Sequence, residues 1–191
     1  MLMSVSDDIA AVSSGARFYR ADLHIHSYGG SHDVKDHLMT SEAIVKTALA
    51  EQLRLIAITD HNEISNVPAA IKAAGTVISV VPGVELSTPE GHLLVYFAEY
   101  QDLADFFGKL DCVGRGGSDS RCQTSLLECL KKIDPAKGFG ILAHVDGEGG
   151  FEQKVPGYPP RKGDVLTHPA LLGIELKSFK SDISYSDLGT R

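Results

Sequence analysis

Hydrophobic residues along this chain gather in short runs, separated by stretches in which apolar positions recur at helical spacing. Several runs, such as Leu55 to Ile58, are apolar without polar alternation, which is typical of strands buried on both faces of a sheet. The pattern predicts about six strands, over residues 18–25, 55–59, 76–81, 92–98, 140–145 and 173–176.

The stretches with helical spacing carry signals for where a helix begins and ends. Ser125 and Glu128 form a capping box, and Pro68 and Gly75 bracket another helix. Helices are expected over residues 40–53, 67–74, 102–110 and 125–133, and over 166–172 with an interruption at Pro169. Strands and helices therefore alternate with short connections, which is typical of a parallel α/β sheet or barrel.

Three segments depart from this alternation. Residues 111–121 contain a run rich in Gly and Ser and are expected to form a flexible loop. Residues 146–164 are rich in Gly and Pro and long enough for a lid or a rim loop. Residues 1–16 are rich in Ser, Ala and Asp, and we expect a flexible leader there, ahead of a single domain over 17–191.

Length and composition are those of an ordinary globular protein. The 191 residues suit one domain, with 43% hydrophobic and 23% charged residues. A net charge of −7 argues against broad adhesion to nucleic acid or membrane surfaces. No apolar run approaches the ~20 residues that span a bilayer, and no secretory signal is visible. We therefore expect a cytoplasmic protein with no membrane partner.

The cysteines add little at this level. Cys112, Cys122 and Cys129 show no CxxC spacing. We interpret them as reduced thiols that behave as small, partly buried hydrophobic side chains, and we do not expect a zinc site built from them.

Histidines, by contrast, gather beside the ends of the predicted strands. His24 and His26 lie on one face of the first strand, because residues i and i+2 of a strand point to the same side. Beside the ends of the later strands lie His61, Glu85, His92 and His144. The carboxyl ends of parallel strands build the ligand site of α/β proteins. His92 begins its strand instead, and reaches the same rim only if a tight turn follows Glu85.

Packing alone explains this joint pattern poorly, because buried imidazoles and carboxylates need partners. Neutral imidazole nitrogens and carboxylate oxygens are ligands for zinc, manganese and iron. The sequence therefore predicts a divalent-metal site. Asp22 and Asp60 lie close to candidate ligands in sequence, and we expect them either to orient the imidazoles or to hold a strand end or cap.

Five motifs resemble, in order and spacing, those of the PHP (polymerase and histidinol phosphatase) family. They are DLHIHS at 22–27, ITDHN at 58–62, PGVE at 82–85, HLLVY at 92–96 and AH at 143–144. The resemblance implies a distorted (β/α)7 TIM-like barrel with two or three divalent metal ions (Zn, Mn or Fe) at its mouth. It also implies hydrolysis of a phosphomonoester or phosphodiester.

The same resemblance suggests how the ligands are shared among the ions. His24 and His26 would hold one ion. Glu85 would bridge to a second ion, held also by His92 and His144. In this scheme the metal-activated water attacks phosphorus, and the ions neutralise the charge that develops.

A third ion would be bound by His61 with a nearby acid, and here the chain departs from the family. The usual short S-D-G after HxH is replaced by a longer run, residues 27–33. Asp33 is the candidate ligand, with His32 as a substitute. Both residues are also candidates for proton transfer to the leaving group.

The predicted rim loops carry three arginines, Arg115, Arg121 and Arg161, which are candidates for binding a substrate phosphate. A small phosphorylated molecule or a nucleic-acid end would fit such a site. The family's final D-x-H motif has no counterpart, residues 181–184 being the nearest match. We therefore expect a barrel that is incomplete at the C-terminus. The leader and the long loop are similar to PHP modules fused to an ATPase-like region, which would be absent from this chain.

Two other functions are consistent with the motifs. Amidohydrolases also place HxH at the end of the first strand of a barrel, although the TDHN and GVE runs favour a phosphoesterase. A fragment without the final motif could instead be a catalytically incomplete, metal-binding regulatory module.

Overall fold

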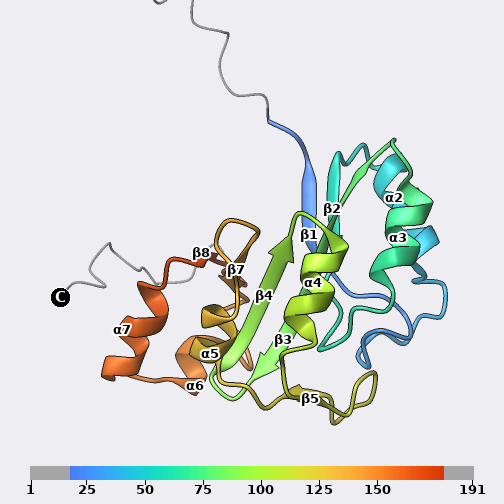
Figure 1. The fold of residues 1–191 in the computed structure, drawn as a ribbon. Helices are drawn as coiled ribbons and strands as arrows, with labels where there is room; N and C mark the ends of the chain where they lie inside the picture. The colour runs from blue at the N-terminus through green and yellow to red at the C-terminus, as the bar shows by residue number, and fades with distance from the viewer. Residues whose placement is uncertain (1–17, 179–191) are drawn as a thin grey trace, which may run out of the picture.

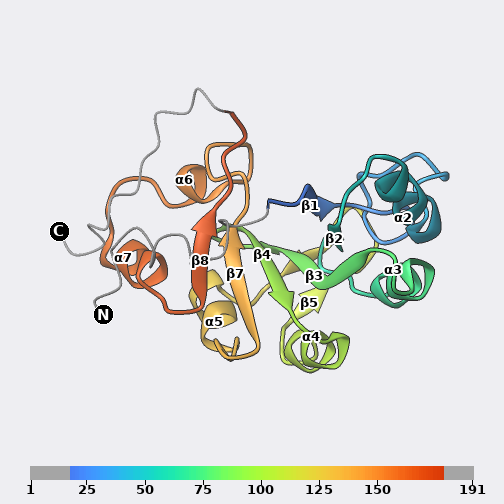
Figure 2. The same ribbon diagram turned by 90° about the horizontal axis from the view of Figure 1, so that it is seen from above.

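The computed structural model describes residues 18–178, which form one curled sheet of six strands with helices against it (Figure 1). The strand order is β1-β2-β3-β4-β7-β8, so β1 and β8 are the two margins of the sheet. The strands are β1 (Ala21–Ile25), β2 (Leu55–Ile58), β3 (Ser79–Thr88), β4 (Gly91–Phe97), β7 (Gly138–Leu142) and β8 (Leu171–Ile174). The curvature gives a half-barrel, seen from above in Figure 2.

The helices lie mainly along the outer side of this half-barrel (Figure 2). They are α2 (Ser41–Ala50), α3 (Val67–Ala74), α4 (Tyr100–Phe107), α5 (Leu126–Lys131), α6 (Phe151–Lys154) and α7 (Pro160–Leu166). The main core joins the helices to the outer face, with residues such as Ile56 and Leu103 fully buried. A smaller apolar cluster on the inner face contains Ala57, Leu94 and Tyr96. Ile56 and Ala57 thus serve opposite faces, as neighbours in a strand do.

Local capping follows the sequence signals. Helix α3 has the predicted bounds, with Pro68 in its first turn. The Ser125 hydroxyl accepts a hydrogen bond from the Glu128 amide (3.4 Å), which is the first half of the predicted capping box. The Glu128 side chain does not return to the cap; it pairs with Lys131 at 2.7 Å.

The expectation of a parallel sheet is only partly correct. β1–β2, β2–β3 and β7–β8 are parallel, but β4 is antiparallel to both β3 and β7. The strand predicted over 76–81 extends to Thr88 and turns directly into β4 as a hairpin. Gly91 has φ +124°, a conformation that favours glycine, and closes that turn. Glu85 therefore lies within a strand and not after one.

Three other expectations are corrected. Residues 111–121 are not entirely a loop, because two short strands, β5 (Cys112–Val113) and β6 (Arg121–Cys122), pair there as a small hairpin. Residues 146–164 contain α6 and the start of α7 and are not one loop. The helix expected over 166–172 is wrong: α7 ends at Leu166 and β8 begins at Leu171, because Pro169 cannot donate the backbone hydrogen bond that would continue the helix.

Some predictions fall outside the described residues. The leader over 1–16 and the 181–184 segment both lie there, and the seven-stranded barrel stays an expectation. Among residues 18–178, no helix has the length and apolar character needed to cross a bilayer.

Candidate metal centre

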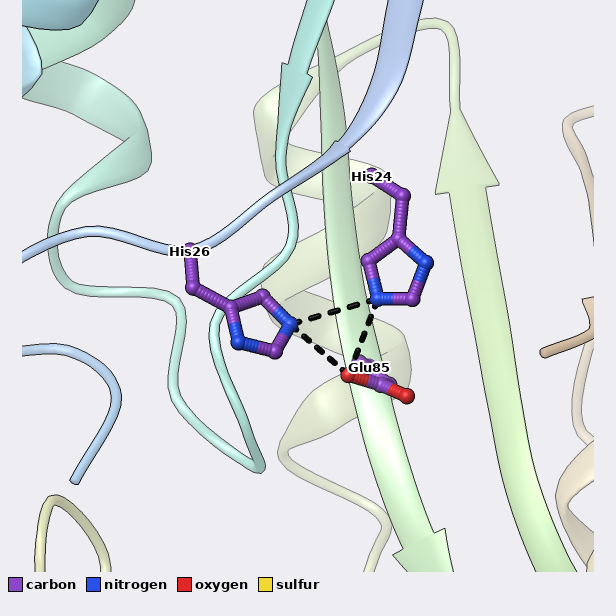
Figure 3. A group of neighbouring side chains, drawn as sticks. All are labelled: His24, His26 and Glu85. Atoms are coloured by element: carbon purple, nitrogen blue, oxygen red, sulfur yellow. Dashed lines mark hydrogen bonds and ion pairs between the residues drawn. The ribbon is translucent and has the colours of Figure 1, made fainter. Parts of the chain in front are cut away.

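Glu85 is the centre of the histidine cluster. Its side chain is fully buried on the inner side of β3, while its neighbours Val84 and Leu86 belong to the main core. Oε2 lies 3.1 Å from His24 Nε2 and 2.8 Å from His26 Nε2, the group drawn in Figure 3. A single oxygen of Glu85 therefore contacts both histidines of the HxH pair.

The other carboxylate oxygen serves a second pair of imidazoles. Glu85 Oε1 lies 2.9 Å from His92 Nδ1 and 3.0 Å from His144 Nε2. His61 Nδ1 approaches Oε2 at 3.3 Å. Five imidazoles from four parts of the chain thus surround one carboxylate.

Backbone pairing explains how these side chains converge. His24 lies in β1 and His26 just beyond it, on the same face. His61 follows β2 and forms an isolated parallel bridge with Glu85. The β3–β4 hairpin brings His92 opposite Ser87 and so back to the rim, as the sequence required. His144 follows β7 with φ +28°, a backbone conformation that is uncommon for a residue with a side chain.

A second carboxylate lies at the exposed side of the cluster. Asp33 Oδ2 is 3.1 Å from His26 Nδ1 and 3.9 Å from His61 Nε2, and the Asp33 side chain is 49% exposed. Three overlapping groups result: His24, His26 and Glu85; His26, Asp33 and His61; His61, Glu85 and His92. Within each group one candidate ligand atom per residue lies within 4.8 Å of the others.

The electrostatics of the cluster are set by its buried carboxylate. Burial disfavours the charged form of Glu85, but hydrogen bonds from His144, His24 and the other imidazoles hold its pKa well below the ordinary value. Burial likewise opposes charge on His24, yet hydrogen bonds to Glu175 and Glu85 raise the pKa of His24 to about 10. Burial and the neighbouring imidazoles lower the pKa of His61 to about 4.

The chemistry of this donor set fits divalent metal ions. A buried carboxylate ringed by imidazoles offers nitrogen and oxygen donors without thiolates, a set used by zinc, manganese and iron. Because a ligand imidazole must give its ring lone pair to the metal, binding at His24 would release a proton. The two oxygens of Glu85 face different imidazole pairs, which is the arrangement a bridging carboxylate needs.

Glu175 is a site residue that the sequence analysis missed. It directly follows β8, and its oxygens lie 3.1 and 3.0 Å from His24 Nδ1. Oε2 also accepts a hydrogen bond from the His144 backbone amide at 3.0 Å. The available signal was a carboxylate near the end of the last predicted strand, over 173–176, beside the kind of strand end that singled out the histidines.

Asp60 holds a turn of the backbone, where an imidazole contact was expected. It is buried and accepts hydrogen bonds from the Ser27 amide (2.6 Å), the Ser27 hydroxyl (2.5 Å) and the Ser31 hydroxyl (3.0 Å). The Ser31 hydroxyl in turn accepts a hydrogen bond from the His61 amide at 2.9 Å. Asp60 therefore positions His61 through Ser31. The Asp22 carboxylate accepts a hydrogen bond from the His24 backbone amide at 3.3 Å.

His32 lies beside the cluster. Its ring centroid is 5.7 Å from that of His61. The His32 Nδ1 atom is buried and has no hydrogen-bond partner among the described residues. A buried, unsatisfied ring nitrogen is costly, so this atom is available to a ligand or a water molecule.

The three candidate phosphate-binding arginines have partners outside the cluster. The Arg115 guanidinium lies 4.6 Å from the centre of the Phe107 ring. Arg121 donates to the Asp119 carbonyl at 3.1 Å, and Arg161 pairs with Glu90 at 3.3 Å. Each would have to leave, or share, its present partner to bind a substrate.

Comparison with known proteins gives a partial match in sequence. No known family profile matches the chain. The 5′-3′ exoribonuclease Rnm of Salmonella typhimurium is 37% identical over 70 residues, which are 35% of this chain. The match spans 22% of that relative, so the chain corresponds to about a fifth of its length.

Two solved structures share the fold. A protein of Bifidobacterium adolescentis described as a metal-dependent phosphoesterase superposes with a TM-score of 0.56 at 15% identity, over 81% of this chain and 76% of that one. An amidohydrolase of Chromobacterium violaceum, with sulfate bound and no metal, gives a TM-score of 0.53 at 18% identity, over 81% and 75%. At these identities the likeness concerns the fold, and it supports a partial TIM-like barrel for the half-barrel described above.

Proposed function

We propose that this chain is a metal-dependent phosphoesterase, of the PHP type that its motifs resemble. The observation that carries the proposal is the buried Glu85 carboxylate with five imidazoles around it. The short match to an exoribonuclease and the fold shared with a described phosphoesterase support the same class. When bound, divalent ions would activate a water molecule for attack at phosphorus and neutralise charge on the phosphoryl oxygens.

The proposed ligands divide between the two oxygens of Glu85. His24 and His26 would share one ion with Oε2, and His92 and His144 a second ion with Oε1. A third ion would be held by His61 and Asp33, with His26 close to both. This last set lies at the exposed side of the cluster, where a substrate can enter.

The chain's own residues divide the remaining tasks. Burial opposes charge on Asp33, but the nearby His26 and His61 lower its pKa, so the carboxylate is ionised and suited to hold a cation. His32 carries the free buried ring nitrogen and is the better candidate for giving a proton to the leaving group. Glu175 fixes His24: a proton on Nδ1 bonded to Glu175 leaves Nε2 free as the ligand atom.

The proposed substrate is a small phosphorylated molecule or a nucleic-acid end. The exoribonuclease match favours a 5′ nucleic-acid end, whereas the net charge of −7 disfavours extended contact with a duplex. Arg115, Arg121 and Arg161 stay candidates for the substrate phosphate. A cytoplasmic location and an ATPase-like C-terminal partner region rest on the sequence alone.

An amidohydrolase is the second candidate, because one fold neighbour is described as such. A substrate panel separates the two. The first group tests phosphoester hydrolysis, with p-nitrophenyl phosphate, bis-p-nitrophenyl phosphate and 5′-phosphorylated oligonucleotides as substrates. The second group tests hydrolysis of amides and cyclic ureides. Turnover confined to the second group would replace the phosphoesterase proposal. Stoichiometric metal with turnover of neither group would favour the regulatory module.

Removal of both HxH imidazoles is expected to abolish metal-dependent turnover. In a His24→Ala/His26→Ala variant, Glu85 Oε2 loses its two nearest nitrogen neighbours and keeps only the more distant His61 Nδ1, so one ion loses both of its proposed imidazole ligands. Metal content by mass spectrometry should fall by at least one ion per chain, and phosphate release with Mn²⁺ should fall to the level of chelator-treated protein. Unchanged turnover, or no bound metal in the parent, would refute the assignment.

Replacement of Glu175 with glutamine is expected to weaken metal binding without unfolding the protein. Glutamine keeps the shape of the side chain but loses the charge that orients His24, and loss of such a partner costs about 10–100-fold in metal affinity. Competition with a fluorescent zinc chelator measures this change. Glu99→Gln, at an exposed residue without a side-chain cap bond, is the matched control. Equal affinities for the two variants would remove Glu175 from the site.

A further inference from the structure

The three cysteines, which are not closely spaced in sequence, gather at the β5–β6 hairpin. Cys112 lies in β5, Cys122 in β6 and Cys129 in α5, and all three are free thiols. The Thr124 carbonyl accepts a hydrogen bond from Cys122 Sγ and another from Cys129 Sγ, each at 3.7 Å. Cys112 is partly exposed, whereas the other two are fully buried. The trio does not form a metal-binding group of the described residues.

The strand register places two of these thiols face to face. Cys112 and Cys122 are direct partners in the antiparallel ladder. The Gln123 amide donates to the Asp111 carbonyl at 2.7 Å, so the adjacent pair is the hydrogen-bonded one. Cys112 and Cys122 therefore form a non-hydrogen-bonded pair, in which the Cα atoms lie about 4.5 Å apart. That separation is within the range of about 4.4–6.8 Å that a disulfide spans.

We propose that Cys112 and Cys122 are a reversible dithiol–disulfide pair, a redox modification site that staples the base of this hairpin. The oxidant is a small-molecule disulfide such as oxidised glutathione. The sulfur of the partly exposed Cys112 thiol attacks it as the thiol proton is lost, and one glutathione thiolate leaves and takes up that proton. The Cys122 thiolate then attacks the Cys112 sulfur of the mixed disulfide and releases the second glutathione. Two protein thiols are oxidised and one glutathione disulfide is reduced to two thiols.

The surroundings favour Cys122 over Cys129 as the partner of Cys112. Hydrogen bonds from Cys112 and Cys129 lower the pKa of the Cys122 thiol. The bond from Cys129 is still available once Cys112 has reacted, and it favours the thiolate needed for the second step. Cys129 lies in a helix, fully buried, where an oxidant reaches it least. Cys129 is not part of the β5–β6 ladder that aligns Cys112 with Cys122.

The hairpin also contacts the candidate metal centre. Ser120, at the end of the hairpin loop, accepts a hydrogen bond from Asn62 Nδ2 at 3.2 Å and donates to the His61 carbonyl at 3.4 Å. Cys122 lies two residues after Ser120. A disulfide between Cys112 and Cys122 would therefore restrain β6, next to the residue that contacts His61. The disulfide itself is independent of the proposed phosphoesterase activity.

The test equilibrates the native chain in buffers of reduced and oxidised glutathione, followed by alkylation and peptide mapping. Trypsin alone leaves Cys122 and Cys129 in one peptide, so a glutamate-specific protease is added to cleave after Glu128. We expect the 3 free thiols of the chain to fall by two in oxidising buffer. The map should show a peptide containing Cys112 linked to one containing Cys122, and excess reduced glutathione should reverse the link.

Variants sharpen the result. Cys129→Ala should still lose two thiols, whereas Cys112→Ser should keep both of its remaining thiols in the same buffers. Three free thiols throughout, a link that includes Cys129, or a disulfide between two chains would each overturn the proposal. The map of the native chain decides this even where a variant does not fold.

Discussion

Exchange of Glu85 for glutamine is expected to abolish metal binding and to destabilise the metal-free protein by about 3 kcal/mol. The carboxylate is fully buried, and its two oxygens contact five imidazoles from four other segments of the chain. An amide of the same shape brings no charge to offset a cation, and its NH₂ group faces ring nitrogens where an oxygen was needed. Calorimetric metal titration and urea unfolding measure the two effects.

Glu51→Gln, at an exposed position that ends α2, is the matched control and should leave both quantities unchanged. Metal binding by Glu85→Gln at the parent's stoichiometry and affinity would contradict the central role of this carboxylate. Loss of stability without loss of metal would reduce Glu85 to a structural partner of the histidines.

Gly30→Ala should produce the second large effect, a loss of about 3 kcal/mol in unfolding free energy. A methyl group on Gly30 would lie 2.0 Å from Asp60 Oδ2, so one of the two must move. Asp60 is buried and accepts three hydrogen bonds from Ser27 and Ser31, so moving it breaks those bonds. The disturbance should reach His61 through Ser31 and weaken metal binding there as well.

Gly163→Ala provides the comparison, because nothing lies within 4 Å of the added carbon. Gly163 is inside helix α7, where alanine is the better helix former, and we expect a gain of up to about 1 kcal/mol. Denaturant unfolding of the two variants, side by side, measures the difference. Equal stabilities would show that the turn around Asp60 is not rigid.

The histidine cluster could be predicted because its members obey simple local rules. His24 and His26 share a face through the two-residue period of a strand, and His61 follows a run that is apolar throughout. The resemblance then supplied the order of the motifs. The convergence itself needed the curled sheet, since only that brings His144 within 3.0 Å of Glu85.

The direction of β4 and the role of Asp60 could not be predicted so well. The run at Pro82 and Gly83 suggested the end of a strand, yet both residues lie within β3 in a ladder with β2 and β4. Asp60 precedes His61 in sequence, which suggested a contact between the two side chains. Its side chain instead binds Ser27 and Ser31, which lie 33 and 29 residues away along the chain, so tertiary packing decides its partners.

The contact between Glu175 and His24 also matters for the fold, because the two residues lie at opposite margins of the open sheet. β1 and β8 share no backbone ladder among the described residues, yet the contact of 3.0 Å between these side chains draws them together. This ion pair thus links the two margins of the open sheet, which no backbone ladder joins within residues 18–178. A metal ion bound by His24 would strengthen this link, so amide hydrogen exchange in β1 should slow on metal loading. The residues proposed to bind metal would then also join the two free margins of the sheet.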